Sequence, residues 1–326
     1  MGPKGRSWPQ TRAMEITRDA IESAAVRIAP FVRLTPTLKL ENQAIELPDR
    51  AIPSWRTILK LDLLQPTGTF KVRGAFNLLL VNRPDLVVAA SGGNFALAIA
   101  HAAEALGIRA HLFVPDSSPP EKIGRLTNSG ADVTIVKGVY RDALAKSREF
   151  AATVDGFFAH AYDQAEVVAG AGTCGLEILA QVPDVDTVLV AVGGGGLIGG
   201  IASAVRTGAR VIGVETHGTP TLHAARAAGH PVDVEVGGLA LSSLGSTRLG
   251  DISWEAVSRW VTDSVLVTDE SVKDAQRFLW QTCRLVAEPR GAATMAALLS
   301  GAYQPATHET VVALVCGANV DPAAVV

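Results

Sequence analysis

The sequence predicts an α/β fold in which parallel sheets carry helices on both faces. Short runs rich in β-branched residues alternate with alanine-rich helical runs along most of the chain. Glycine-rich turns follow several of the strand-like runs, as they do where a strand of an open parallel sheet leads into a helix. No internal repeat occurs, and no proline- or serine-rich linker separates two halves. We therefore expect any second domain to be inserted within the first.

The expected elements follow from local patterns in chain order. A helix is expected near 17–27, where Thr17 or Asp19 supplies a capping side chain. The proline-containing segment TPTLKL then indicates a loop that enters an extended stretch. After it, β-branched runs predict strands, and the alanine-rich runs between them predict helices. The strands are expected near 57–64, 87–91, 109–115, 132–137, 187–192, 210–215 and 310–316, and the helices near 74–80, 95–106, 119–129, 140–153 and from 197 onward.

Composition and charge describe a compact protein with a small-molecule partner. The 326 residues are 48% hydrophobic and 19% charged, which excludes a disordered chain. The 29 basic and 32 acidic residues nearly balance, so nothing indicates a nucleic-acid or membrane surface. The three cysteines lie far apart without a CxxC pair, which argues against structural zinc. Since the start has no signal-like apolar stretch and six glycines break the apolar run 187–204, we expect a cytoplasmic protein.

A run of four glycines lies in the segment TVLVAVGGGGLIGGIASAVR, between a strand-like and a helical run. Such a turn lets backbone amides and a helix N-terminus face an anion, so a phosphate-binding loop is the functional interpretation. The alternative is that the glycines only permit tight packing. The same run also fits GxGxxG, with Glu215 ending the next strand, which keeps a nicotinamide-dependent dehydrogenase open. That interpretation leaves the earlier motifs of the chain unexplained.

A second motif, LLQPTGTFKVRGAFNLLL, places Lys71 after Phe70 at the start of a predicted helix. A lysine is a useful nucleophile only when burial or a nearby positive charge disfavours its ammonium form. Phe70 and Arg73 are candidates for these influences. An isolated lysine in this position would be interpreted as a surface residue, so the surrounding pattern decides.

The segment QPTGTFKVRGA resembles the cofactor-lysine segment of the serine/threonine dehydratase family, whose usual form is close to QxTGSFKxRGA. That family belongs to the tryptophan-synthase-β-like group of pyridoxal-phosphate enzymes. SGGNFALAIA resembles the family's SxGNHAxA loop, and GGGGLIGG resembles its phosphate loop. GVETHGTPTL, EPRGAAT and CGANVD resemble its late segments, so the resemblance covers about residues 35–321.

The resemblance implies a fold and a set of site residues. It implies a large cofactor domain formed by 1–84 plus 161–326, with a small domain, 85–160, inserted in it. Lys71 is then the catalytic residue, which binds pyridoxal phosphate as a Schiff base and moves the Cα proton. The remaining implied cofactor contacts are Phe70, Asn94, Gly193, Gly194, Gly195, Gly196, Leu197 and Cys316. The implied substrate contacts are Ser91, Gly92, Gly93 and Asn94.

The implied activity is dehydration and deamination of L-threonine or L-serine to a 2-oxo acid and ammonia. Cys316 aligns with the residue that faces the pyridine nitrogen, where a neutral thiol suits elimination. β-Replacement, racemisation or lyase chemistry on another hydroxy-amino acid are the alternatives within the same fold. A non-catalytic amino-acid-binding module would not need Lys71, Asn94, the glycine run and Cys316 together. We expect a homodimer or a higher homo-oligomer, and a catabolic role because no regulatory segment follows CGANVD.

Some positions depart from the family's pattern. Phe95 replaces the histidine of SxGNH, which makes the loop more apolar, and Gly92 stands where related racemases carry a serine. Some members bind a metal through a glutamate after the VIGVE strand and a nearby aspartate. Glu215 is present, but Thr219 and Thr221 occupy the stretch expected to supply the partner. We therefore expect no divalent metal site, and either a monovalent cation or none.

Overall fold

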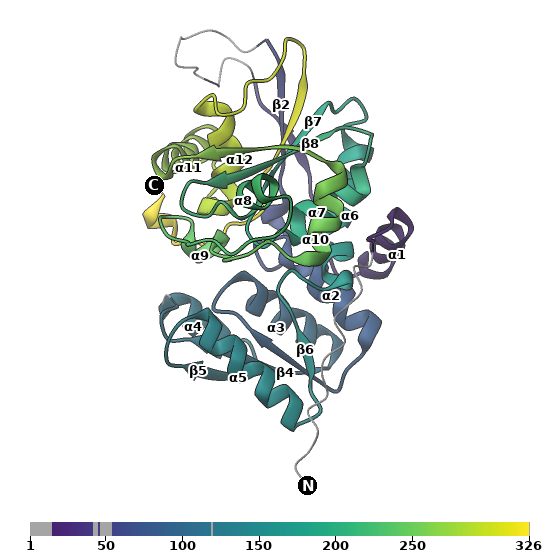
Figure 1. The fold of residues 1–326 in the computed structure, drawn as a ribbon, viewed down its shortest axis with the longest axis vertical. Coiled ribbons are helices and arrows are strands. Elements are labelled where there is room, and N and C mark those ends of the chain that lie inside the picture. Colours follow the sequence, from purple (N-terminus) through teal and green to yellow (C-terminus); the bar gives the residue numbers. More distant parts are fainter. Residues whose placement is uncertain (1–14, 42–44, 46–53, 119, 326) are drawn as a thin grey trace.

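The structure, a computed structural model, describes residues 15–41, 45, 54–118 and 120–325. Two sheets form its framework, with helices packed around both (Figure 1). The six-stranded sheet lies in the upper part of that view and the four-stranded sheet in the lower part. All neighbouring strands in the described residues are parallel except at one edge of the larger sheet. The predicted α/β fold is thereby confirmed.

The larger sheet joins strands from the two ends of the described chain. In spatial order it contains β1 (Thr37–Lys39), β2 (Arg56–Lys60), β10 (Thr310–Leu314), β7 (Thr187–Ala191), β8 (Arg210–Thr216) and β9 (Val261–Val267). Every residue of β7 and β10 is buried, which explains why these strands read as continuous apolar runs in the sequence. β1 is the antiparallel edge strand.

The smaller sheet is built from one continuous stretch of chain. Its order is β5 (Asp132–Val136), β4 (Arg109–Pro115), β3 (Leu86–Ala90) and β6 (Phe157–Ala159), all parallel. These strands fall within the range 85–160 that the sequence assigns to an inserted domain. The domain boundaries themselves stay a prediction.

Helices cover the faces of both sheets and fill the space between them. They are α1 (Arg18–Ile28), η2 (Asp62–Leu64), α2 (Lys71–Asn82), α3 (Asn94–Leu106), α4 (Pro120–Thr127), α5 (Tyr140–Thr153), α6 (Ala165–Gln181), α7 (Gly196–Val205), α8 (Thr221–Ala228), α9 (Leu241–Leu244), α10 (Asp251–Trp260), α11 (Asp269–Cys283), α12 (Pro289–Leu299) and η3 (Pro322–Ala324). Within the described residues, no helix combines the length and the apolar character that crossing a bilayer requires.

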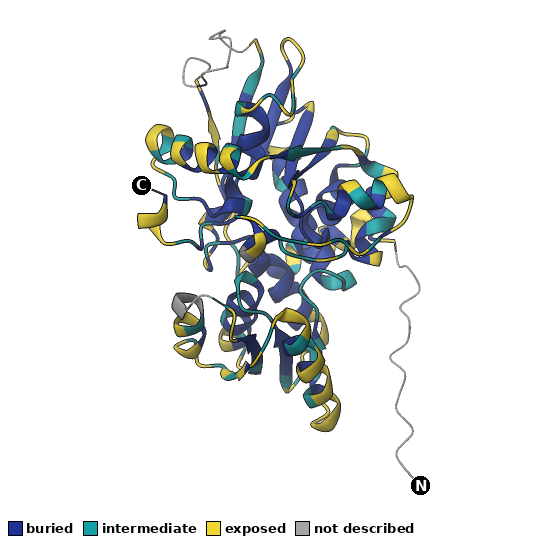
Figure 2. Cartoon of the chain, turned by 60° about the vertical axis from the view of Figure 1, so that its left-hand side comes forward, coloured by how far each residue is buried: buried dark blue, intermediate teal, exposed yellow. Residues whose placement is uncertain are grey.

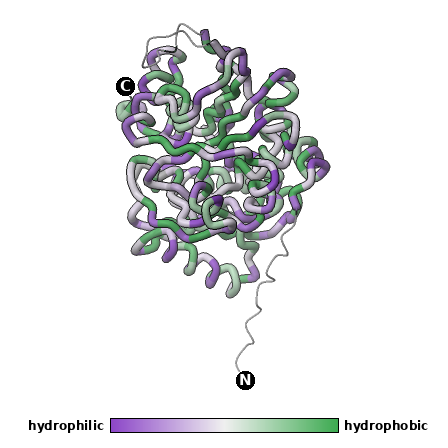
Figure 3. The backbone as a smooth tube through the Cα atoms, turned by 45° about the horizontal axis from the view of Figure 1, so that its top comes forward, coloured by the Kyte–Doolittle hydropathy of each residue, from purple (hydrophilic) through white to green (hydrophobic). Residues whose placement is uncertain are grey.

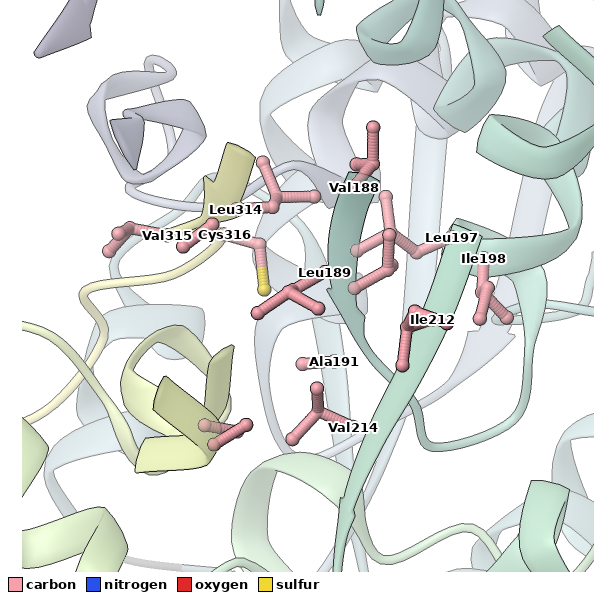
Figure 4. Close-up of a cluster of buried hydrophobic side chains, with 14 of the residues drawn as sticks. Val188, Leu189, Ala191, Leu197, Ile198, Ile212, Val214, Leu314, Val315 and Cys316 are labelled. Carbon is pink, nitrogen blue, oxygen red and sulfur yellow. The ribbon is translucent and has the colours of Figure 1, made fainter. Parts of the chain in front are cut away.

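Burial follows these layers closely. Buried residues concentrate in the strands and in the helices between the two sheets, while outer helix faces are exposed (Figure 2). Hydrophobic and hydrophilic stretches alternate along the chain, as amphipathic elements require (Figure 3). The largest core cluster packs β7, β8, β10 and α7 against one another, and Figure 4 shows part of it around Leu189, Ile198 and Cys316.

Three buried helices, α2, α6 and α7, approach one another through glycines. A Cβ added at Gly74 would lie 2.8 Å from the carbonyl oxygen of Val167, and one at Gly200 would lie 2.3 Å from that of Val168. Backbone atoms cannot move aside as side chains do, so these positions require glycine. The close packing thus holds α2, which begins with Lys71, and α7 against the same helix, α6.

Several elements differ from the sequence prediction. α2 begins at Lys71 rather than near residue 74, because its N-cap residue, Phe70, offers no capping side chain and gives no start signal. α6, β9 and the helices between β8 and β10 were not predicted. β9 alternates exposed and buried positions irregularly, so its sequence lacks the run of apolar residues that marks the buried strands.

Candidate active site

The lysine segment is fixed to the end of strand β10. The amide of Phe70 donates to the carbonyl of Cys316 (3.1 Å), and the hydroxyl of Thr69 donates to the same oxygen (3.3 Å). Thr69 also forms an isolated antiparallel bridge with Gly317. Gly68 makes the turn before this segment with a φ of 72°, which a side chain would strain. Two motifs that lie about 250 residues apart in sequence thus meet in one place.

Lys71 lies in apolar surroundings and is only 9% exposed. Its Nζ donates to the carbonyl of Ala161 at 2.6 Å, and lies 5.2 Å from the ring centre of Phe70 and 5.7 Å from that of Phe95. Burial lowers the pKa of Lys71 well below its usual value, and the nearby charge of Arg290 lowers it further. The amine is therefore held toward its neutral, nucleophilic form.

Arg73, the expected source of positive charge, is directed elsewhere. It is fully buried and forms ion pairs with Asp62 (2.6 Å) and Glu177 (2.7 Å). Lys60 joins the same network through Glu177 at 2.5 Å. These pairs attach α2 to η2 and α6, so Arg73 anchors the helix that carries Lys71. The expectation that Arg73 influences the amine directly is thus replaced by an influence from Arg290.

The loop 91–94 follows strand β3 and leads into α3. The amide of Gly93 donates to the hydroxyl of Ser91 at 3.2 Å, and Asn94 is the first residue of the helix. The side-chain amide of Asn94 donates to Glu288 (2.6 Å), and its oxygen accepts from Asn319 (2.7 Å). This network ties the loop to the segments before α12 and after β10.

The glycine run forms the turn between β7 and α7. Gly195 has a φ of 88°, and α7 begins at Gly196, so the free amides of its first turn, Leu197 included, lie at the end of the run. A Cβ at Gly194 would lie 2.4 Å from ring carbons of Tyr162, which shows how closely that ring approaches the backbone. The carbonyl of Gly193 accepts from Thr221 at 2.6 Å.

Two neighbouring residues connect this turn to the lysine. Ala161 accepts the hydrogen bond from Lys71, and Tyr162, the next residue, packs on Gly194. An amine, an anion-binding turn and the Asn94 network therefore surround one region at the carboxyl ends of β3, β7 and β10. Open parallel sheets bind their ligands at such a place.

Cys316 lies at the end of β10, fully buried among apolar side chains (Figure 4). Its Sγ is 3.9 Å from the carbonyl oxygen of Arg290. Burial raises the pKa of Cys316 to about 12, against a smaller lowering by Arg290. The thiol is thus neutral at physiological pH.

The carboxylate of Glu215 is held by hydrogen bonds from within the protein. It accepts from the amides of Leu222 (2.7 Å) and His223 (2.8 Å) and from the hydroxyl of Thr221 (3.0 Å), at the N-terminus of α8. Burial raises the pKa of Glu215 to about 7 although these hydrogen bonds lower it. Among the described residues, no group of three or more His, Cys, Asp or Glu side chains could hold a metal ion.

These residues fit a pyridoxal phosphate. The glycine turn offers amides for a phosphate, Lys71 offers a neutral amine for an aldehyde, Phe70 offers an apolar ring, and Cys316 offers a neutral contact. Residues 28–317 match the family described as pyridoxal-phosphate dependent enzyme. The chain belongs to this family.

Curated members of the pyridoxal-phosphate family resemble the chain over most of its length. The chain is 36% identical over 321 residues to the L-threonine dehydratase catabolic TdcB of Staphylococcus aureus, covering 92% of this chain and 88% of that protein. It is 34% identical over 271 residues to TdcB of Escherichia coli strain K12, covering 81% and 82%. It is 31% identical over 336 residues to a serine racemase of Oryza sativa, covering 98% and 96%.

Two solved structures have the same fold as this chain. A threonine deaminase from T.th. superposes with a TM-score of 0.86 at 30% identity, over 94% of this chain and 99% of that one. The maize serine racemase gives 0.87 at 28% identity, over 96% and 95%. The fold is therefore that of the serine racemases and threonine deaminases, as the sequence resemblance implied.

Sequence reasoning missed several residues of the site. Ala161 and Tyr162 are single positions whose neighbours in sequence give no motif of their own, whereas Asn319 lies in the quoted segment CGANVD but received no role. In the segment EPRGAAT, the sequence placed Glu288 near the cofactor without a role, and Arg290 was missed. A basic residue beside a glutamate in a segment of otherwise small residues was the signal that could have identified Arg290.

Proposed function

We propose that the chain is an ammonia-lyase that dehydrates and deaminates L-threonine or L-serine to a 2-oxo acid and ammonia. The observation that carries this proposal is a buried lysine, held toward its neutral form, beside an anion-binding turn. Relatives that are 34% and 36% identical are named as threonine dehydratases, which supports the substrate class.

The roles follow from the positions of the side chains. Lys71 would attach the cofactor, and the amides of 193–197 would hold its phosphate. Bound pyridoxal phosphate supplies an electron-withdrawing ring that acidifies the Cα–H bond of an amino acid. The neutral Nζ of Lys71 would accept the Cα proton of the bound amino acid. The carbonyl of Ala161, its present hydrogen-bond partner, holds the amine in place for this step.

The remaining residues orient the reactants. Ser91, Gly92 and Gly93, with the first amides of α3, receive the substrate carboxylate. Asn94 is fixed between Glu288 and Asn319, and its side chain would help to hold the cofactor. Phe70 would offer the cofactor an apolar contact, and Cys316 would offer it a neutral thiol in place of a carboxylate. A neutral contact there suits elimination.

The architecture and setting belong to the same proposal. The chain has a large domain, 1–84 plus 161–326, with a small domain, 85–160, inserted in it. It acts in the cytoplasm as a homodimer or a larger homo-oligomer. The continuous four-stranded sheet of 86–159 supports the division. Light scattering after size-exclusion chromatography measures the oligomeric state, and a monomer at working concentration would contradict it.

The activity is tested by an absorbance spectrum combined with detection of 2-oxo acid and of D-serine. With L-threonine or L-serine, the wild type is expected to show the cofactor band and to form 2-oxo acid. Lys71→Ala should lose both, while Lys39→Ala, a change at an exposed lysine, should keep both. A band with D-serine but no 2-oxo acid would replace the lyase by a racemase. No band after addition of pyridoxal phosphate would overturn the proposal.

A further inference from the structure

Arg290 brings a positive charge into the cofactor region. It lies in the first turn of α12, and its guanidinium carbon is 5.5 Å from the ring centre of Phe70. Its Nε is buried and makes no hydrogen bond within the described residues. None of the ion pairs found in the described part of the chain involves Arg290. The charge of Arg290 is therefore not neutralised by any of these ion pairs, whereas that of Arg73 is neutralised by Asp62 and Glu177.

Arg290 and Lys71 share one aromatic ring. The Nζ of Lys71 lies 5.2 Å from the centre of the Phe70 ring that Arg290 also contacts. Their charged atoms are therefore at most about 11 Å apart, a distance at which two like charges still repel in a protein interior. The Phe70 ring therefore lies beside both side chains.

Other ionisable groups also face Lys71. Cys316, after β10, and Glu288, before α12, favour the charged amine, whereas Arg290 opposes it. Burial lowers the pKa of His160, directly after β6, to about 4, and the charge of Lys71 contributes to that lowering. Since the Cys316 thiol is neutral and His160 is held uncharged by burial, Glu288 and Arg290 are the two charges that compete at the amine.

We propose that Arg290 is a positioning residue that adds to burial in keeping Lys71 neutral, and thereby lowers the pH at which the chain can attach its cofactor. This inference rests on the proposed role of Lys71 and extends it. Arg290 acts through the amine rather than on the substrate. Arginine is not deprotonated in proteins, so the effect of this side chain does not vary with pH.

The test follows cofactor attachment instead of turnover. The full-length chain is freed of cofactor, pyridoxal phosphate is added, and the rate at which the absorbance band returns is measured from about pH 6 to about pH 10. Arg290→Met should move the midpoint of this profile upward by about one pH unit and slow attachment about tenfold on its acid side. Arg290→Lys retains the charge and should keep the wild-type midpoint.

A matched control removes a similar arginine elsewhere. Arg284 also lies on an aromatic ring, 5.6 Å from the centre of Trp280, but is exposed, and Arg284→Met should leave the profile unchanged. An unshifted profile in Arg290→Met, a uniform slowing at every pH, or equal shifts in Arg290→Met and Arg290→Lys would overturn the inference. So would a wild type that forms no band. If Arg290→Met shifts the pH profile as expected but the wild type forms no 2-oxo acid, the inference about Arg290 stands and the proposed ammonia-lyase activity is refuted.

Discussion

Replacing Arg73 by Met tests the buried ion pairs that anchor the helix of Lys71. The side chains of Arg73 and Asp62 are 1% and 0% exposed. Removing the arginine leaves the buried Asp62 carboxylate with the side chains of Thr35 and Gln65 as its remaining donors among the described residues. Loss of one partner of a buried pair costs about 3–5 kcal/mol in free energy of unfolding. For a chain of this size the melting temperature should fall by on the order of 5 °C.

The assay is urea denaturation followed by circular dichroism, with two comparison variants. Arg277→Met breaks an exposed pair with Asp274, and should cost about 0.5 kcal/mol or less. The double variant Arg73→Met/Asp62→Leu removes both charges and should be more stable than Arg73→Met alone.

The pH dependence of the same variant gives a further check. Burial opposes ionisation of Asp62, yet Arg73 and then Lys60 hold the pKa of Asp62 below 3.8. That stabilisation is present above the unfolded pKa and is lost as the pH falls through the folded one. The deficit of Arg73→Met should therefore shrink toward acid pH. A deficit below about 1 kcal/mol at neutral pH, or one independent of pH, would refute the argument.

Two further predictions concern packing and protonation. Gly200→Ala should destabilise the protein by about 1–3 kcal/mol in thermal melts, because its Cβ would lie 2.3 Å from the carbonyl oxygen of Val168. Gly124→Ala in α4, where the added Cβ meets open space, is the control and should be neutral or stabilising. Burial raises the pKa of Glu215 from 4.5 to about 7, so the folded state binds this proton more tightly than the unfolded state does. The free energy of unfolding should therefore fall by about 3 kcal/mol as the pH rises from 4.5 to 7. Glu215→Gln should flatten that part of the profile, and an unchanged slope in urea melts across this range would contradict the assignment.

The sequence predicted most of the framework because buried parallel strands are continuous apolar runs. β7 and β10 have no exposed residue, and their β-branched runs marked them clearly. β9 was missed because its register places polar residues on exposed positions within the strand. The start of α2 was misplaced by three residues because tertiary hydrogen bonds from Phe70 and Thr69 fix it, and local sequence carries no sign of them.

The site was predictable where a motif is contiguous and was missed where the chain folds back on itself. Lys71 and the glycine run belong to segments whose residue types state their chemistry. Ala161 contributes only a backbone carbonyl, which any residue could supply, so its contact with Lys71 is invisible in sequence. The same holds for Arg290, whose distance from Phe70 depends on how α12 packs against β10.

The order of strands in the larger sheet also determines when this site can form during synthesis. β2 pairs with β10, so residues 56–60 must wait for 310–314 before they have a neighbour on that side. The backbone of Thr69 and Phe70 waits for Cys316 and Gly317 in the same way. The four-stranded sheet needs only 86–159 and can pair while the ribosome is still at work. A nascent chain therefore carries the lysine through most of its synthesis without the support that holds it, and the site is complete only once residues 310–317 have been made and have folded back.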